Sequence, residues 1–419
     1  MTVAALERAA RAAGGKIIAV LAARFRDLSL AEDAYSEACL RAAQTWPSDG
    51  APDDPAAWLY RAAYRRALNA LRASKLRERL LPEQPLPEPH AEDAMLDDAR
   101  LIPDERLRLI FVCCHPAVAM EARAALTLRL VCGLTTQEIA RAFLLPEPTL
   151  AQRLARAKRK IQDAGVSYEV PGPEAWPERL AAVLSTLEVA YAKAHEDAAG
   201  AGPHAGYAAE MLELTRVLCE LLPSEPGALS LAATVRYAEA RRPARLDREG
   251  AMIPLSEQDP ARWSSPLIAE ANTFLVRAMN VGRPDARVFQ ATIHGLWCAR
   301  AGLHEPAPWR QVLESYDVLL HYRDDPVVRL NRAVAVAEIH GPQLALAELT
   351  QLSSERLQGF APYHAVRADL LRRLGRTEEA LESYAAALAQ GVGEAEAIWM
   401  RRQRTALLAA RDERERKGI

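Results

Sequence analysis

The pattern of apolar and polar positions predicts helices along the whole chain. It is clearest between residues 149 and 162, where apolar residues recur at steps of four, three and four, at Leu150, Leu154, Ala157 and Ile161. This spacing places them on one face of a helix. Alternation of β-branched or aromatic residues with polar ones, which strands would show, is hard to find. Because the helix-favouring residues alanine, leucine and arginine are abundant, we expect an all-α fold.

A shorter helix is predicted just before this one. Thr135 and Glu138 have the spacing of a capping box, which marks a helix N-terminus. This helix should reach about Phe143, residues 144–148 should form a turn, and the longer helix should begin at Thr149. A short helix, a tight turn and a longer helix form a helix-turn-helix, whose second helix fits the DNA major groove.

The polar face of the longer helix carries the candidate DNA-binding residues, which are Thr149, Gln152, Arg153, Arg156 and Lys160. Glutamine and arginine can form paired hydrogen bonds with base edges, and further cations can hold phosphates. The alternative is an ordinary helical hairpin with a solvated basic face. We favour DNA recognition, because residues 149–162 contain five bases and no acid, whereas solvated faces usually mix both signs.

Charge along the chain is segregated, although 53 lysines and arginines nearly balance 55 acids overall. Residues 58–79 hold seven bases and one acid, and residues 80–105 hold eight acids, one base and five prolines. These prolines rule out a continuous helix, so we expect an acidic linker over residues 81–105. A chain of 419 residues is too long for one compact core, so several domains are expected.

Aromatic residues are interleaved with the first group of bases. Rings can stack on unpaired bases while arginines hold the backbone, which is the chemistry of single-strand binding. The candidates are Tyr60, Arg61, Tyr64, Arg65 and Arg72. The alternative is that the aromatic side chains belong to the core. We favour the core for Trp58 and leave both interpretations open for Tyr60 and Tyr64.

Another helix is predicted over residues 30–46, with Asp33, Glu37 and Arg41 on one face at intervals of four. One interpretation is a solvated face with a Glu37–Arg41 pair that contributes ~0.3–0.5 kcal/mol. The other is an acidic surface that binds a basic partner. The spacing alone favours the first interpretation.

Three of these segments resemble the extracytoplasmic-function (ECF) sigma factors of bacterial RNA polymerase: residues 30–44, 55–72 and 126–162. Residues 30–44 resemble region 2.2, which in the family binds the β′ subunit, so the resemblance assigns Asp33, Glu37 and Arg41 to core-polymerase binding. Residues 55–72 resemble regions 2.3 and 2.4, which open and read the −10 element. Residues 126–162 resemble region 4, whose second helix reads the −35 element. The resemblance implies promoter DNA and the β and β′ subunits as partners.

The sequence is most similar to a subgroup with a tetratricopeptide-like C-terminal extension. The matching segments run over residues 106–116, 121–129, 133–143 and 152–161. Two positions depart from the usual family pattern in the −10 region, since Arg65 stands where asparagine is typical and Asn69 where aspartate is typical. The promoter sequence therefore cannot be transferred from relatives.

The C-terminal half shows a repeat instead of a basic surface. Asn331–Ala333 matches Val366–Ala368, Ala345 matches Ala380, and Leu349 matches Tyr384, each 35 residues apart. This pattern resembles tetratricopeptide repeats, whose small residues let paired helices pack closely. Such stacks usually bind peptides or partner helices, so we expect a protein partner, although a purely structural stack is the alternative. The predicted domains are thus 1–80, 81–105, 106–170, a helical extension over 171–290, and repeats over 291–419.

A non-helical insert is predicted near residues 244–263 within the helical extension. Similar segments mark the extended sigma subgroup, which suggests regulatory positions at Asp247, Gly250, Gln258, Asp259 and Trp263. Pro260 stands where that pattern usually has arginine. No histidine or nucleophile lies at a diagnostic spacing from these acids, so we expect no enzyme activity.

The six cysteines do not form a disulfide or metal-binding pattern. Only Cys113, Cys114 and His115 cluster, and adjacent side chains on a helix point ~100° apart, so we expect buried reduced thiols and no metal or other cofactor. No apolar run approaches the ~20 residues of a membrane span, and no signal peptide is visible. These features predict a soluble cytoplasmic protein.

The prediction from sequence is a sigma factor whose C-terminal repeats control its activity in cis. One alternative is a helix-turn-helix regulator with a repeat-based sensor domain that does not bind polymerase. Another is a tetratricopeptide scaffold that binds only protein. The basic aromatic segment and the acidic linker favour the sigma factor, because neither alternative has a use for them.

Overall fold

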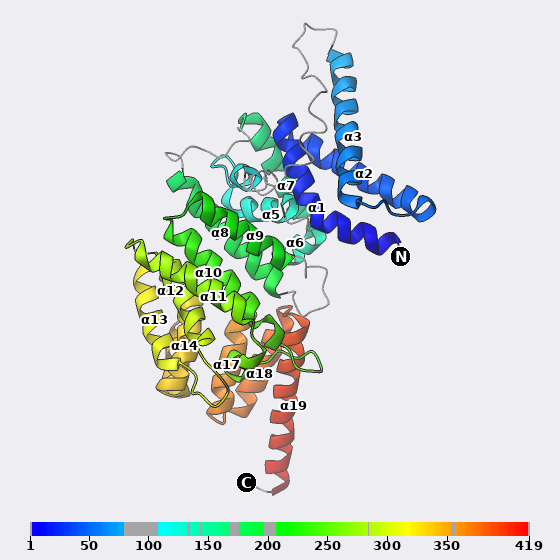
Figure 1. The fold of residues 1–419 in the computed structure, drawn as a ribbon. Coiled ribbons are helices and arrows are strands. Elements are labelled where there is room, and N and C mark those ends of the chain that lie inside the picture. The colour runs from blue at the N-terminus through cyan, green and yellow to red at the C-terminus, as the bar shows by residue number, and fades with distance from the viewer. Residues whose placement is uncertain are drawn as a thin grey trace. The chain divides into compact units, whose positions relative to one another are not determined.

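The computed structural model is helical throughout its described parts (Figure 1). The structure describes residues 2–78, 108–131, 135–142, 145–166, 176–196, 207–283, 285–352, 357 and 359–417. Apart from an isolated antiparallel bridge between Leu246 and Met252, regular structure in these ranges consists of α-helices and short 3-10 helices. The predicted all-α class is confirmed. The predicted acidic linker, residues 81–105, lies outside the described ranges.

The chain folds as two compact units, Met1–His195 with Gly206–Leu218, and Glu196–Ala205 with Cys219–Ile419. The helices of the first unit are α1 (Thr2–Phe25), α2 (Leu28–Asp49), α3 (Pro55–Glu78), α5 (Met120–Leu130), α6 (Thr136–Ala142), α7 (Glu147–Asp163), α8 (Trp176–Glu196) and α9 (Tyr207–Leu221), with a further helical segment over 108–113. The helices of the second unit are α10 (Pro226–Arg241), α11 (Ser265–Asn280), α12 (Ala286–Cys298), α13 (Trp309–Tyr322), α14 (Pro326–Ile339), α15 (Pro342–Gln351), α17 (Ala361–Arg373), α18 (Thr377–Ala389) and α19 (Glu394–Lys417).

Helices α1, α2 and α3 pack together at the start of the first unit. Two aspartates cap the second and third helices: the Asp27 carboxylate accepts from the Leu30 amide at 2.9 Å, and that of Asp54 accepts from the Ala57 amide at 2.9 Å. Trp46 and Trp58 meet edge to face across α2 and α3, with ring centroids 5.5 Å apart. Such caps typically stabilise a helix by ~1 kcal/mol, and the ring contact orients α3 against α2.

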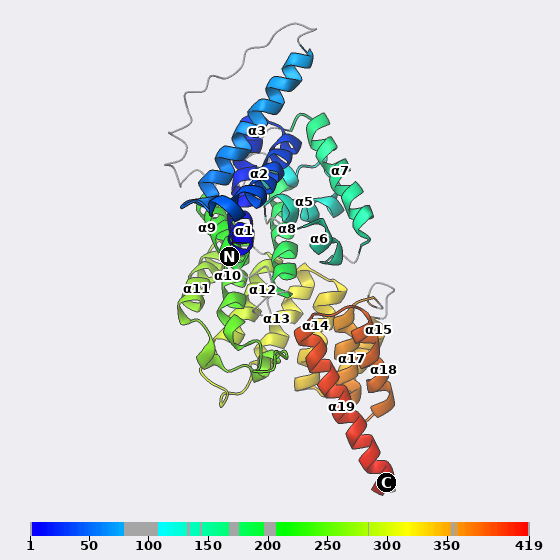
Figure 2. The same ribbon diagram turned by 90° about the vertical axis from the view of Figure 1, so that its right-hand side faces the viewer.

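Helices α5, α6 and α7 form the predicted helix-turn-helix region, and Figure 2 shows α7 beside α5 and α6. The predicted apolar face of α7 is confirmed, since Leu150, Leu154, Ala157 and Ile161 are all buried. The predicted start of this helix at Thr149 is wrong by two residues, because α7 begins at Glu147. Pro148 therefore belongs to the helix and not to the turn. Proline is tolerated in the first turn of a helix, where its missing N–H is not needed.

The repeat predicted in the C-terminal half is visible as helix pairs. Helices α14 and α15 begin at Pro326 and Pro342, and α17 and α18 begin 35 residues later, at Ala361 and Thr377. The equivalent positions Ala345 and Ala380, and Leu349 and Tyr384, are fully buried. Small side chains at the first pair of positions allow close helix packing, and large ones at the second pair fill the core between helices.

We expect Tyr384→Ala to destabilise the second unit by about 3–5 kcal/mol, because it removes a fully buried ring that packs edge to face near Trp399. Thermal and urea unfolding of the full chain would measure the change. The control is Glu382→Ala, an exposed position on the same helix, which should shift stability by less than about 0.5 kcal/mol. Equal effects of the two substitutions would show that the repeat has no core at Tyr384.

Candidate nucleic-acid interface

Helix α7 presents its predicted polar residues on the side opposite its buried apolar face. Gln152, Arg156 and Lys160 are exposed, and Thr149 and Arg153 are partly exposed. The Arg156 Nε lies 3.4 Å from the carbonyl oxygen of Gln152, so this guanidinium rests along the helix. The structure therefore brings all five predicted residues together on one helix, with hydrogen-bond donors and positive charge directed outward. This arrangement can bind phosphates and base edges.

One base of α7 has a different environment. The Lys158 ammonium donates to the Glu32 carboxylate of α2, and the Arg129 Nε of α5 lies 3.1 Å from the other oxygen of that carboxylate. Glu32 is only 8% exposed. Sequence reasoning missed this cluster, because Glu32 and Lys158 are 126 residues apart and no local pattern links them.

Helix α3 presents the arginines of the first basic segment to solvent, with Arg61, Arg65 and Arg72 exposed and Tyr60 partly buried. Tyr64 is different. It is 9% exposed, and its ring lies 5.5 Å from that of Phe25 and 6.0 Å from that of Tyr60. This corrects the interpretation in which the Tyr64 ring stacks on a base: the ring fills the core between α1 and α3.

The outer face of α2 carries the predicted acidic surface. Asp33, Glu37 and Arg41 are exposed, but Glu37 pairs with Arg66 of α3 at 2.7 Å, not with Arg41 as the simpler interpretation supposed. Leu40 lies among them and is 59% exposed. A leucine at an i+3 step from Glu37 gives this face an apolar centre, which sequence analysis did not single out. The helical spacing could have indicated this exposure, because Leu40 lies off the buried stripe formed by Ala31, Ala34, Ala38 and Ala42.

The predicted insert is a compact loop held by hydrogen bonds within the second unit. Asp247 accepts from the amides of Glu249 and Ala251, both at 2.9 Å, and Gly250 has φ of 82°, a conformation that favours glycine. Arg402 of α19 reaches the second carboxylate oxygen of Asp247 at 2.5 Å. The hydrogen bond from Arg402 lowers the pKa of Asp247 below its ordinary value.

The other predicted regulatory residues also support this loop. The Gln258 side chain is buried and donates to the Ile253 carbonyl at 3.0 Å. The Asp259 carboxylate accepts from the Ala261 amide at 3.0 Å and caps a short 3-10 helix. The Trp263 side chain is buried. Gly250, Gln258, Asp259 and Trp263 therefore shape the insert, and Asp247 fastens it to α19.

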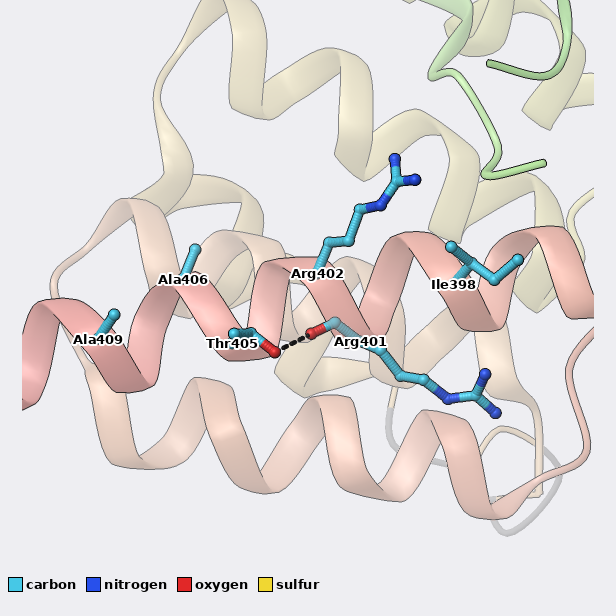
Figure 3. A pocket seen from close by; sticks show the side chains of 6 residues that line it. All are labelled: Ile398, Arg401, Arg402, Thr405, Ala406 and Ala409. Carbon is cyan, nitrogen blue, oxygen red and sulfur yellow. Dashed lines mark hydrogen bonds between the residues drawn. The ribbon is translucent and has the colours of Figure 1, made fainter. Parts of the chain in front are cut away.

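A shallow hollow lies along α19 beside this contact. Its lining residues are Ile398, Arg401, Arg402, Thr405, Ala406 and Ala409. Figure 3 shows Arg401 and Arg402 pointing to different sides of the helix, with the Thr405 hydroxyl bonded to the Arg401 carbonyl at 2.9 Å. The hollow is open, and its lining consists of two arginines, a threonine and apolar side chains.

The Cys113 and Cys114 thiols are buried, as predicted. Burial raises the pKa of the Cys114 thiol to about 11, and its sulfur lies 3.4 Å from the Thr186 hydroxyl of α8. Among the described residues, no three histidine, cysteine, aspartate or glutamate side chains converge as metal ligands would. Within those same ranges, every helix is too short or too polar to cross a bilayer.

Comparison with protein families identifies both halves of this interface. Residues 10–77 match sigma-70 region 2, and residues 109–161 match sigma-70 region 4. Residues 179–279 match a family of unknown function, DUF6596. An uncharacterized protein of Rhizobium meliloti (strain 1021) is 38% identical over 384 residues, which are 90% of this chain and 90% of the relative. No solved structure shows a significant match.

Asp247→Asn should destabilise the insert at neutral pH, because a neutral amide cannot hold Arg402 as a carboxylate does. A depressed pKa in the folded state gives stability above the unfolded value of about 3.9, and this stability is lost as the pH falls through the folded value. We therefore expect a lower free energy of unfolding than wild type at pH 7, and a difference that narrows as the pH falls below the unfolded pKa of about 3.9.

Urea unfolding at pH 7 and at about pH 3, below the unfolded pKa of an aspartate, would check this expectation. Glu382→Gln is the matched control, since its carboxylate is exposed on α18. Its difference from wild type should stay small at both pH values. A deficit of Asp247→Asn that is the same at both would contradict the assigned ion pair.

Proposed function

The chain belongs to the sigma-70 family as an ECF-type sigma factor with a C-terminal extension, and from this premise we propose what its individual residues do. It binds core RNA polymerase and promoter DNA and directs the enzyme to its promoters. Sigma factor families are not enzymes. We propose that it acts in the cytoplasm, which contains the polymerase and the chromosome. We also propose that its functional domains are residues 1–80, 81–105, 106–170, 171–290 and 291–419.

The proposal rests on one observation: two exposed helix faces of different chemistry lie within the two sigma-matching regions. The face of α2 combines the carboxylates of Asp33 and Glu37 with the apolar Leu40 and the cation of Arg41. Such a mixed surface suits a basic helical partner with an apolar centre, because charge steers association and apolar contact slows dissociation. We assign it to the β′ subunit of the core polymerase.

Helix α3 supplies the −10 contacts in this proposal. Arg61, Arg65 and Arg72 are exposed, and they can hold the backbone of an opened strand. Tyr60 is the aromatic side chain with an accessible edge, whereas Tyr64 supports it from the core at a ring distance of 6.0 Å. In this proposal Tyr60 stacks on a base, and Tyr64 does not.

Helix α7 supplies the −35 contacts. Thr149, Gln152 and Arg153 lie near its N-terminus, the end that a helix-turn-helix directs at base edges. Arg156 and Lys160 follow at steps of four from Gln152, along the same side, and can hold phosphates on either flank. The five residues thus combine sequence readout with positioning.

We further propose that the C-terminal unit regulates the sigma regions in cis and that its helix pairs bind a protein partner. The insert is fastened to α19 through Asp247 and Arg402, which supports a unit built to hold a defined shape. The open hollow along α19 and the paired helices offer a contact surface of the kind that helical repeats use for peptides.

The decisive experiment for the sigma function is run-off transcription with purified core polymerase and genomic fragments. Asp33→Ala combined with Glu37→Ala should weaken core binding at least tenfold and reduce transcripts to match, as measured by pull-down and run-off. The control combines Asp49→Ala and Asp53→Ala, which remove two exposed acids elsewhere in the same three-helix domain. A wild-type chain that binds no core polymerase and starts no transcript would overturn the function.

Regulation in cis is tested by a chain that ends after Leu222, beyond α9. If the second unit controls activity, its removal should change run-off output at least severalfold, with core binding measured in parallel. The full chain carrying Asp247→Ala should shift output in the same direction, since it loosens the insert without deleting the unit. Output equal to wild type in both proteins would refute control by the C-terminal unit.

A further inference from the structure

Helix α19 has an inner face and an outer face. On the inner face Met400 is buried, and Leu407 packs against the core of the helix pairs. At 3.6 residues per turn, Ile398, Thr405 and Ala409 lie on the opposite side, where they line the hollow along the helix (Figure 3). Thr405 and Ala409 are exposed. The outer face is therefore the side of α19 that is open to contact with another molecule.

The outer face has the spacing of a coiled-coil seam. Steps of four, three, four, three and four separate positions 398, 402, 405, 409, 412 and 416. Such steps keep the side chains on one stripe that can face a second helix. The side chains at the centre of the stripe, Thr405 and Ala409, are small, and small side chains let two helix axes approach to ~8 Å. The stripe thus has the geometry of a helix–helix contact surface.

The two ends of this face carry opposite charges. Arg401 and Arg402 lie at its N-terminal end, and Asp412 and Glu413 follow about three turns later at its C-terminal end. The side chains of the hollow between these ends are uncharged. A face that is basic at one end and acidic at the other is complementary to a second copy of itself that runs in the opposite direction.

An antiparallel pair of α19 helices brings these opposite charges together. When Thr405 of one copy lies opposite Ala409 of the second copy, position 402 lies opposite 412 and position 398 lies opposite 416. Arg401 is then only one residue, ~1.5 Å along the axis, from the level of Asp412 in the second copy. A parallel pair would place Arg401 beside Arg401 and Asp412 beside Asp412, which is unfavourable. The charge pattern therefore selects the antiparallel arrangement.

The charges that this pairing needs are accessible. The Arg401 side chain is 59% exposed, and Glu394, which lies 3.3 Å from it, is 74% exposed. The Asp412 side chain is 55% exposed and lies 3.4 Å from Arg411. Because exposed ion pairs contribute little to stability, both side chains can turn toward a second chain at small cost. Arg402 differs, since the insert holds it at one edge of the face.

We propose that the α19 hollow receives α19 of a second copy of this chain, in an antiparallel pair with Thr405 opposite Ala409. The two copies then use the same surface, as a two-fold symmetric dimer does. This inference rests on the contact role proposed for the hollow, and it is independent of polymerase binding. A wholly acidic helix of another protein would meet Asp412 and Glu413 with like charge, so the charge pattern favours a second copy.

Sedimentation equilibrium of the full chain, from about 1 to about 300 µM, tests the pairing. The range covers weak association, which a seam with few large apolar side chains implies. Arg401→Glu and Asp412→Arg should each weaken self-association at least about tenfold, because each places like charges together. The chain with both substitutions should associate within about threefold of wild type, since the ion pair forms again with its signs exchanged.

Two further variants separate charge from packing. Ala409→Gln places a longer uncharged side chain at the centre of the seam and should weaken association about three- to tenfold, because the helices can no longer approach closely. Arg310→Glu is the matched control, since it reverses one exposed arginine on α13 and should leave association unchanged. Circular dichroism melts of each full-length variant establish that it is folded.

The exchange of charges decides the outcome. A wild-type chain that stays monomeric up to the highest concentration overturns the proposal, whatever other protein the hollow binds. A doubly substituted chain that associates as weakly as each single variant also overturns it, because antiparallel pairing requires the rescue. Run-off transcription keeps the two proposals apart. A monomeric chain that starts transcripts refutes pairing alone, and a paired chain that starts none refutes the sigma function alone.

Discussion

Burial of the apolar face of α7 is the constraint on which the rest of this interface depends. Leu150, Leu154, Ala157 and Ile161 fix the rotation of the helix against α5 and α6, and this rotation decides what each remaining side chain faces. Because the apolar side chains face α5 and α6, Gln152 and Arg156 on the other side of the helix are exposed to solvent. Lys158, one residue after buried Ala157, is turned toward α2 and meets Glu32. A single hydrophobic stripe thus separates the bases that can read DNA from the one that binds the protein itself.

The spacing of residues along the chain predicted the features that depend on neighbouring residues within a helix or on a repeat. The α7 stripe and the 35-residue offset of the helix pairs could be read from the chain, since each is set by residues a few turns apart or by exact repetition. The Glu32 cluster could not, because it joins residues 126 apart through the packing of two regions. The position of the Tyr64 ring could not be predicted for a related reason. An aromatic residue among arginines has the same sequence pattern whether its ring faces solvent or packs on Phe25. Only the packing of α1 against α3 distinguishes the two arrangements.

The insert shows how residues of a catalytic type can be structural. In the sequence its acidic residues are of a type that catalytic sites use. In the structure, Asp247 accepts hydrogen bonds from two backbone amides of its own turn and from the Arg402 guanidinium. Asp259 caps a short 3-10 helix. Polar side chains in a non-helical segment must satisfy backbone groups that a helix would satisfy internally. The hydrogen bonds of these two acids therefore account for the shape that the loop holds.

Glu32 has a different electrostatic environment from the exposed bases of α7. Its carboxylate pairs with Lys158 of α7 and Arg129 of α5, and its side chain is 11% exposed. Exposed bases such as Arg156 and Lys160 bind phosphates through charges that salt screens fully, and DNA binding also loses affinity because fewer counterions are released. Raising the salt concentration therefore weakens DNA binding strongly and weakens the shielded Glu32 contact less.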